Sequence, residues 1–168
     1  LTLTSQGNFV KKGGIKMIVL SFMDENYSRS GVYFNQMKKD GLRVSFHQVD
    51  NRISSIIRIM AKLRKYPKTI VLVASPCHLL VPYLRFLTRH YIVFDAGWTL
   101  TESTNTRKLM KFHLTKRAKI FFIDCLALNL ADIVFSESQS QKTFMIRKFW
   151  TKESKIHVIF RKKINNNI

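Results

Sequence analysis

Apolar residues occur along this chain in short runs that alternate with longer segments of helical periodicity. Runs of this length, bounded by polar turns, are typical of strands buried on both faces of a parallel sheet. Because alternating strands and helices form βαβ units, the pattern predicts an α/β fold: a Rossmann-like open parallel sheet of about six strands with helices on both faces. The predicted strands cover residues 17–22, 43–49, 69–74, 91–94, 133–135 and 155–160, and the predicted helices cover 28–40, 52–65, 78–89, 108–130 and 139–150.

The runs differ in how deeply they are expected to be buried. The run TIVLVA at 69–74 is almost wholly apolar and is expected to be a fully buried strand. In RVSFHQV at 43–49 apolar and polar residues alternate, which predicts a strand with a partly exposed face. Gly41 and Pro67 stand where the first two helices are expected to end.

The periodic pattern also sets the expected limits of the domain. Residues 16–160 carry the pattern and, in a chain of 168 residues, make one domain large enough to bury a core. Residues 1–15 have no clear period, and Met17 would be a natural start, so we expect a non-native or disordered leader there. Residues 161–168, RKKINNNI, are expected to be the start of a linker or a broken end.

The balance of charged residues favours an anionic partner. Lys and Arg number 29 against 10 Asp and Glu, a net charge of +19. Nucleic acid, an anionic membrane surface and a phosphorylated substrate are the partner classes that suit this balance. Basic residues form two clusters, which suit an anionic membrane or nucleic acid, or else are solvated surface. The clusters are Arg107, Lys108, Lys111, Lys116, Arg117 and Lys119, and Arg147, Lys148, Lys152 and Lys155 with the aromatic residues Phe144, Phe149 and Trp150.

Several functional classes lack the residues they need. Cys77 and Cys125 lie far apart in apolar surroundings, as buried free thiols do, and there is no Cys-x-x-Cys motif or zinc-spaced His pair, so we expect neither a disulfide nor a metal. There is no apolar run of the roughly 20 residues that a membrane span needs, and no signal peptide pattern. We therefore expect a cytoplasmic protein. If its positive charge binds an anionic membrane, the protein would be peripheral at the inner membrane face. Only Gly31 follows the first run, where a dinucleotide fingerprint needs three glycines, and no Walker A loop or hydrolytic triad occurs.

The candidate chemistry lies after the first and fourth apolar runs, because ligands of parallel sheets bind outside the carboxyl ends of the strands. Ser30 and Gly31 open the first helix, where backbone N–H groups can receive a phosphate; the alternative is an ordinary helix start with Ser30 as N-cap. Asp95 can orient a hydroxyl group or act as a base, or can be a turn residue bonded to nearby backbone. Trp98 can stack on a sugar or a base, or can fill the core.

Five segments in a fixed order resemble the N-terminal domain of GT-B glycosyltransferases, in particular the family 4-like retaining enzymes. They are MIVLSF with the loop ending SRSG, SPCHLLVPYLRFL, VFDAGWTLTES, IDCLALNLADIVFSES and KIHVIF, and together they span residues 17–160. The resemblance implies one half of a GT-B fold. It also implies that the small residues after the first strand, here Ser30 and Gly31, bind the phosphates and sugar of a nucleotide-sugar.

The same resemblance assigns roles to residues near the fourth and fifth strands. Gly97 or Trp98 stands where many members have a His beside the transferred sugar, and Asp95 is then expected to take a related catalytic role. Ser136 and Glu137 stand where the family has cleft-lining residues. The nucleotide-sugar would be the donor substrate, with no cofactor and no metal, and the acceptor would be a glycan or a lipid-linked glycan, as in polysaccharide biosynthesis.

Members of this family carry a second Rossmann-like domain, and their reaction occurs between the two domains. The resemblance therefore implies that this chain is the acceptor-side part of a hexosyltransferase-like glycosyltransferase. It would be inactive as an isolated fragment and would need a missing C-terminal domain or a partner chain. Two alternatives stay open. One is a basic α/β module that binds nucleic acid or an anionic membrane without catalysis, and the other is a flavodoxin-like or regulator domain with Asp24 at its phosphorylation or flavin site.

Overall fold

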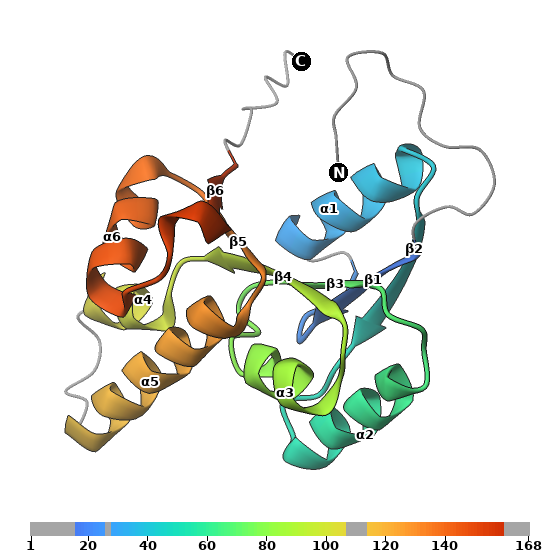
Figure 1. Ribbon diagram of the computed structural model, residues 1–168, viewed down its shortest axis with the longest axis horizontal. Helices are drawn as coiled ribbons and strands as arrows, with labels where there is room; N and C mark the ends of the chain where they lie inside the picture. The colour runs from blue at the N-terminus through green and yellow to red at the C-terminus, as the bar shows by residue number, and fades with distance from the viewer. Residues whose placement is uncertain (1–15, 26–27, 107–113, 160–168) are drawn as a thin grey trace.

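Six parallel strands form a single sheet in the computed structural model. The structure describes residues 16–25, 28–106 and 114–159; for residues 28–30, 104–106 and 114 it describes only the backbone. The order across the sheet is β2-β1-β3-β4-β5-β6, with every neighbouring pair parallel (Figure 1). The predicted α/β, Rossmann-like architecture is therefore confirmed. The strands are β1 (Lys16–Ser21), β2 (Arg43–Gln48), β3 (Ile70–Val73), β4 (Tyr91–Gly97), β5 (Ile133–Ser136) and β6 (Ile156–Val158).

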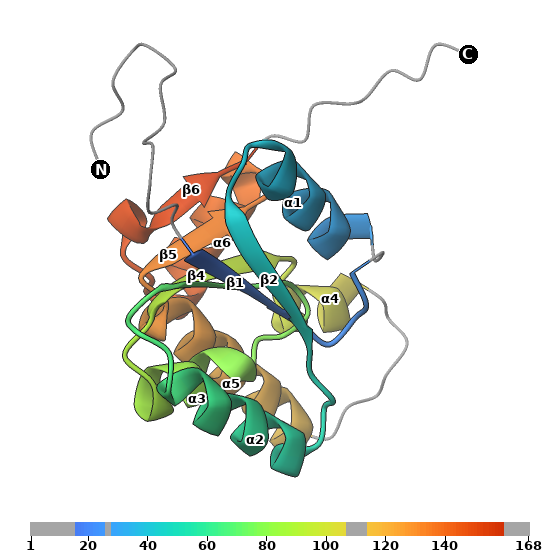
Figure 2. The same ribbon diagram turned by 90° about the vertical axis from the view of Figure 1, so that its right-hand side faces the viewer.

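The helices are distributed unequally over the two faces of the sheet. The connection from β1 to β2 runs toward one edge, whereas every later connection runs the other way. Because such crossovers are right-handed, α1 lies on one face and α2, α3 and α5 lie on the other, as Figures 1 and 2 show, and α6 shares the core of these three helices. The helices are α1 (Ser28–Lys39), α2 (Ile53–Arg64), α3 (Leu80–Leu87), α4 (Leu100–Thr106), α5 (Leu114–Leu130) and α6 (Gln139–Phe149), with a 3-10 turn η1 (Glu153–Lys155) before β6.

Alternating side chains of the strands supply two hydrophobic cores. The larger core lies under the four helices and includes Leu20 of β1, Phe94 of β4 and Phe149 of α6. The smaller one lies under α1, where Phe34 packs against Val19 and its neighbours on β3 and β4. As predicted, β3 is almost completely buried, and β2 is an edge strand whose residues stay partly exposed.

Two regions differ from the sequence-based expectation. Strand β4 runs on to Gly97 instead of ending at residue 94, because Asp95 still pairs with Phe135 of β5 and the small Ala96 fits into the core. Helix α4 was not predicted at all. Of the long helix expected at 108–130, the structure describes the part from Leu114; the leader 1–15, the tail 161–168 and the basic residues Arg107, Lys108 and Lys111 lie outside the described residues.

Candidate functional site

Four of the predicted site residues come together where β4 and β5 end. Gly97 has a positive φ of 51°, a conformation that favours glycine, and it turns the chain so that Trp98 is 48% exposed. The indole Nε1 of Trp98 donates a hydrogen bond to Glu137 Oε2 at 3.1 Å. Gly97 is the register partner of Ser136 across the two strands. The alternative in which Trp98 fills the core is therefore wrong.

Helix α6 holds the β5 side of this site in place. Ser138 is the N-cap of α6, and its Oγ accepts a hydrogen bond from the Gln141 backbone N–H at 3.2 Å. The Gln141 side chain in turn accepts a hydrogen bond from the Glu137 N–H at 3.0 Å. Ser136 is buried and does not line the surface, so it is not a cleft-lining residue, contrary to the prediction.

Asp95 lies deeper than the sequence suggested. It was expected at the end of a strand, in a turn or facing a cleft, but it lies inside β4 and is completely buried. Successive side chains of a strand point to opposite faces of the sheet, so Asp95 lies on the same face as Val93, which is the face covered by α1. A carboxylate that is completely buried cannot touch a bound substrate directly, so Asp95 can influence one only through the residues that cover it.

The phosphate-binding candidates lie in the first turn of α1. The helix begins at Ser28, so Ser30 and Gly31 are inside it, and the alternative of Ser30 as N-cap is wrong. Gly31 is buried. Because the helix of a βαβ unit runs antiparallel to its strands, the N-terminal end of α1 lies at the edge of the sheet where β1 and β4 end, and Trp98 directly follows β4.

A second polar cluster at this edge was not found by sequence reasoning. Asp124 of α5 accepts hydrogen bonds from the backbone N–H groups of Leu100, at 3.2 Å, and Thr101, at 2.7 Å. Thr99 accepts one from the Glu102 N–H at 3.1 Å. Both side chains are buried, and together they hold the N-terminus of α4.

His78 is buried beside this cluster. Its Nε2 lies 3.6 Å from Asp124 Oδ1, and its ring packs edge-on against Phe94. Neither ring nitrogen makes a hydrogen bond within the described part of the chain. Burial lowers the pKa of His78, while the charges of Asp124 and Asp95 act in the opposite direction. The sequence feature that could have pointed to this pair is a single polar residue inside each of two apolar segments: His78 in PCHLL and Asp124 in FIDCL.

The neighbouring cysteine is structural. Cys77 is buried, and its Sγ accepts a hydrogen bond from the Phe22 N–H at 3.0 Å. Burial raises the pKa of this thiol to about 12, so it stays protonated and is a poor nucleophile. This confirms that Cys77 is a core residue, whereas Cys125 is partly exposed.

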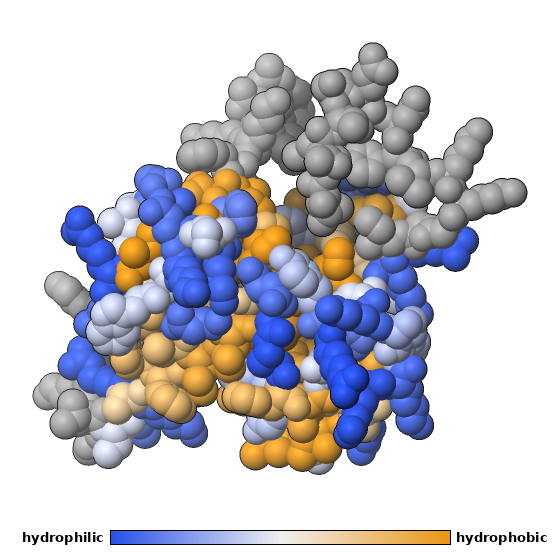
Figure 3. Space-filling view, in the orientation of Figure 1, coloured by the Kyte–Doolittle hydropathy of each residue, from blue (hydrophilic) through white to orange (hydrophobic). Residues whose placement is uncertain are grey.

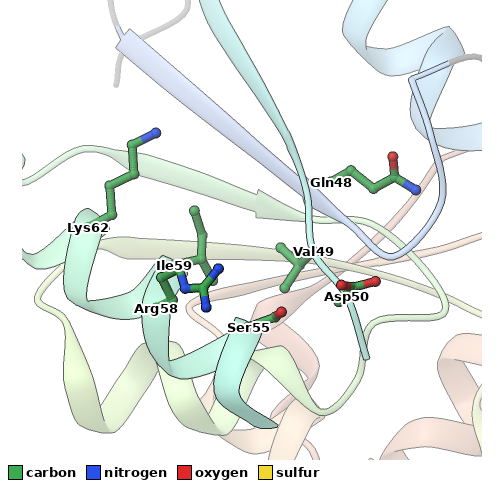
Figure 4. A pocket seen from close by; sticks show the side chains of 7 residues that line it. All are labelled: Gln48, Val49, Asp50, Ser55, Arg58, Ile59 and Lys62. Carbon is green, nitrogen blue, oxygen red and sulfur yellow. The ribbon is translucent and has the colours of Figure 1, made fainter. Parts of the chain in front are cut away.

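A hollow of about 520 Å³ lies away from these residues, between the end of β2 and α2 (Figure 4). Figure 4 shows Lys62 and Asp50 at its two ends, with Arg58 between them. Its lining residues include none of the predicted site residues, so this hollow and the predicted site are separate. It is lined by Gln48, Val49, Asp50, Ser55, Arg58, Ile59 and Lys62.

The second basic cluster does not form one open surface. Lys155 Nζ donates hydrogen bonds to the carbonyls of Asn129, at 2.8 Å, and Ala131, at 2.9 Å, near the end of α5. Burial lowers the pKa of Lys155. Phe149 is completely buried, whereas Trp150 is exposed. Lys155 and Phe149 are therefore part of the packing between α5, α6 and β6.

Two further features of the described residues bear on the class of protein. They contain no group of three or more His, Cys, Asp or Glu placed to hold a metal ion. No helix within the described ranges is long and apolar enough to cross a bilayer.

No protein-family model and no curated protein matches the chain. A crystal structure of HepE from Anabaena in complex with UDP is similar to it, with a TM-score of 0.49 and 12% sequence identity. The similarity covers 88% of this chain and 44% of the HepE chain, so this chain spans less than half the length of that protein.

Proposed function

We propose that this chain is the acceptor-side part of a GT-B, family 4-like glycosyltransferase, which moves a sugar from a nucleotide-sugar to a glycan or lipid-linked acceptor. The observation that carries the proposal is the half-exposed Trp98, whose indole is held by Glu137 at the carboxyl edge of β4 and β5. Ligands of open parallel sheets bind at this edge. An indole face packs against the apolar face of a sugar ring, and a carboxylate accepts hydrogen bonds from sugar hydroxyl groups.

The other predicted residues take supporting roles in this proposal. The N-terminal turn of α1, with Gly31, faces the same edge and supplies N–H groups and a positive helix dipole to a donor phosphate. This recognition uses backbone groups, so it requires no metal. Asp95 and Ser136, both buried, act as positioning residues beneath the turn at Gly97. A second Rossmann-like domain, on this chain's continuation or on a partner, would hold most of the nucleotide.

The experiment measures tryptophan fluorescence. The chain has two tryptophans, so replacing one leaves the emission of the other to be measured alone. In the Trp150→Phe variant all tryptophan emission comes from Trp98. We expect soluble oligosaccharides, with or without UDP-glucose or GDP-mannose, to change that emission in a saturable way. In the control variant Trp98→Phe, emission comes from Trp150 at the end of α6, and the same ligands should leave it unchanged. No response in the first variant, or equal responses in both, would contradict the proposal.

A nucleic-acid-binding module is the second candidate, and the net charge of +19 favours it. This candidate alone predicts tight, salt-sensitive binding of oligonucleotides with no response of Trp98 to sugars or nucleotide-sugars. The two functions are therefore separated by titrating the Trp150→Phe variant with a single-stranded oligonucleotide and with the sugar ligands in parallel.

A further inference from the structure

A second hollow, of about 670 Å³, lies at the opposite edge of the sheet, where β3 and β4 begin. The end of α2 and the turn after it form one side, with Arg64 and Lys68, and the end of α3 and the residues after it form the other, with Phe86, Leu87 and Arg89. These five residues are called the basal surface below. Because parallel strands share one direction, the basal surface is separated from Trp98 by the length of β4.

The basal surface is strongly cationic. Arg64, Lys68 and Arg89 are all exposed, and none of them forms an ion pair within the described ranges. Its lining contains no acidic residue among those that the structure describes. A further cation stands beside it, since Lys16 Nζ lies 4.2 Å from the centre of the Tyr66 ring, which lines the same hollow.

Apolar side chains protrude beside these charges. Phe86 is 73% exposed and Leu87 is 41% exposed, whereas Leu80, Val81 and Leu84 of the same helix are completely buried. The last two residues of α3, Phe86 and Leu87, therefore point away from the core. In Figure 3 strongly hydrophilic atoms stand next to hydrophobic ones in the region where α3 leads into β4.

We propose that the basal surface docks on an anionic phospholipid bilayer. Protruding apolar residues enter the boundary between headgroups and acyl chains, and the surrounding cations bind the headgroup phosphates. Single-stranded nucleic acid would use cations and aromatic stacking but would gain little from an exposed leucine. The pairing of Phe86 with Leu87 thus favours the bilayer. The inference concerns a surface remote from Trp98 and stands without the proposed glycosyltransferase function.

The test is co-sedimentation of the full chain with vesicles of phosphatidylcholine alone or with a quarter of phosphatidylglycerol. We expect binding to the anionic vesicles only. The double variant Phe86→Ser, Leu87→Ser should bind them at least about tenfold more weakly. The matched control is Phe122→Ser on α5, which removes another aromatic residue that is 62% exposed and should bind as the wild type does.

The charges are tested in the same assay. Lys68→Gln, Arg89→Gln should weaken binding by roughly tenfold, whereas the exposed pair on α5, Lys116→Gln, Lys119→Gln, should have a much smaller effect. All four positions are exposed, so the variants should fold, which circular dichroism checks. Equal losses in the basal and control variants would overturn the proposal, as would tight binding of a single-stranded oligonucleotide without binding to vesicles.

Discussion

Individual polar residues behind the carboxyl edge of the sheet owe their chemistry to burial. His78, Asp124 and Asp95 are all completely buried, and the charges of both carboxylates act on the His78 ring. Because a buried charge is costly without a partner, the folded protein keeps His78 neutral over a wider pH range than the unfolded chain does. The stability of the fold should therefore depend on pH through this residue.

We predict that stability falls as the pH is lowered from 7.5 to 5.5. Unfolded His78 takes up a proton near pH 6.5, whereas its folded pKa is lowered, so the unfolded state binds more protons between the two values. The limiting slope for one proton is about 1.4 kcal/mol per pH unit. His78→Gln should flatten the dependence measured by urea unfolding. His47, whose pKa is also lowered by burial, should leave a smaller dependence of the same sign.

The control for this experiment is His157→Gln, because His157 is exposed. This variant should keep the pH dependence of the wild type. Parallel curves for the wild type and His78→Gln would mean that His78 does not titrate differently in the two states.

At the scale of the elements, α4 depends on a distant side chain. It has seven residues, LTESTNT, with little apolar character. Its N-terminus is held by Asp124 from the middle of α5, which accepts hydrogen bonds from the N–H groups of Leu100 and Thr101. A short helix of this kind is stable only with tertiary support.

We predict that Asp124→Ala destabilises the protein by about 1–3 kcal/mol, because it leaves two helix N–H groups without acceptors. For a chain of this size that corresponds to a loss of roughly 3–10 °C in Tm. Asp124→Asn, which keeps one acceptor oxygen, should lose less. The control Glu153→Ala removes an ion pair between the exposed Glu153 and the partly buried Lys142, and it should lower Tm by less than Asp124→Ala does. A Tm for Asp124→Ala equal to that of the control would show that α4 does not depend on this cap.

The same elements show what the sequence can and cannot predict. Strand β3 and helix α2 were predicted within a residue or two, since their apolar periodicity records local burial directly. Helix α4 was missed because its cap belongs to α5, and β4 was cut short because Asp95 was taken as a strand end. The contact of Trp98 with Glu137 joins two turns far apart in the sequence, so the residues were predicted but not their pairing.

At the scale of the whole molecule, basic residues gather at the edge of the sheet where the strands begin. Basic residues end α1, α2 and α6, where they complement the helix dipoles at the edge where the strands begin. Most of the acidic residues lie toward the other edge. They are Asp24, Glu25, Asp50, Asp95, Glu102, Asp124 and Glu137, against Asp40, Asp132 and Glu153 near the edge with the basal surface. The exposed Lys116, Arg117 and Lys119 at the start of α5 offset these acidic residues, so the edge with the basal surface is distinguished by having few acidic neighbours, and an anionic bilayer would attract it.

Docking through the basal surface predicts the orientation of the bound protein. The seven residues of β4 span roughly 20 Å, so Trp98 should stay in water when the basal surface touches the bilayer. In the Trp150→Phe variant, bound to vesicles with brominated acyl chains, the emission of Trp98 should remain unquenched. In Phe86→Trp, made together with Trp98→Phe and Trp150→Phe, the emission should be quenched strongly. Quenching of Trp98 to the same extent would mean that the carboxyl edge meets the membrane. If the proposed function holds, unquenched Trp98 would limit the acceptor to a soluble glycan or the distal end of a long lipid-linked one.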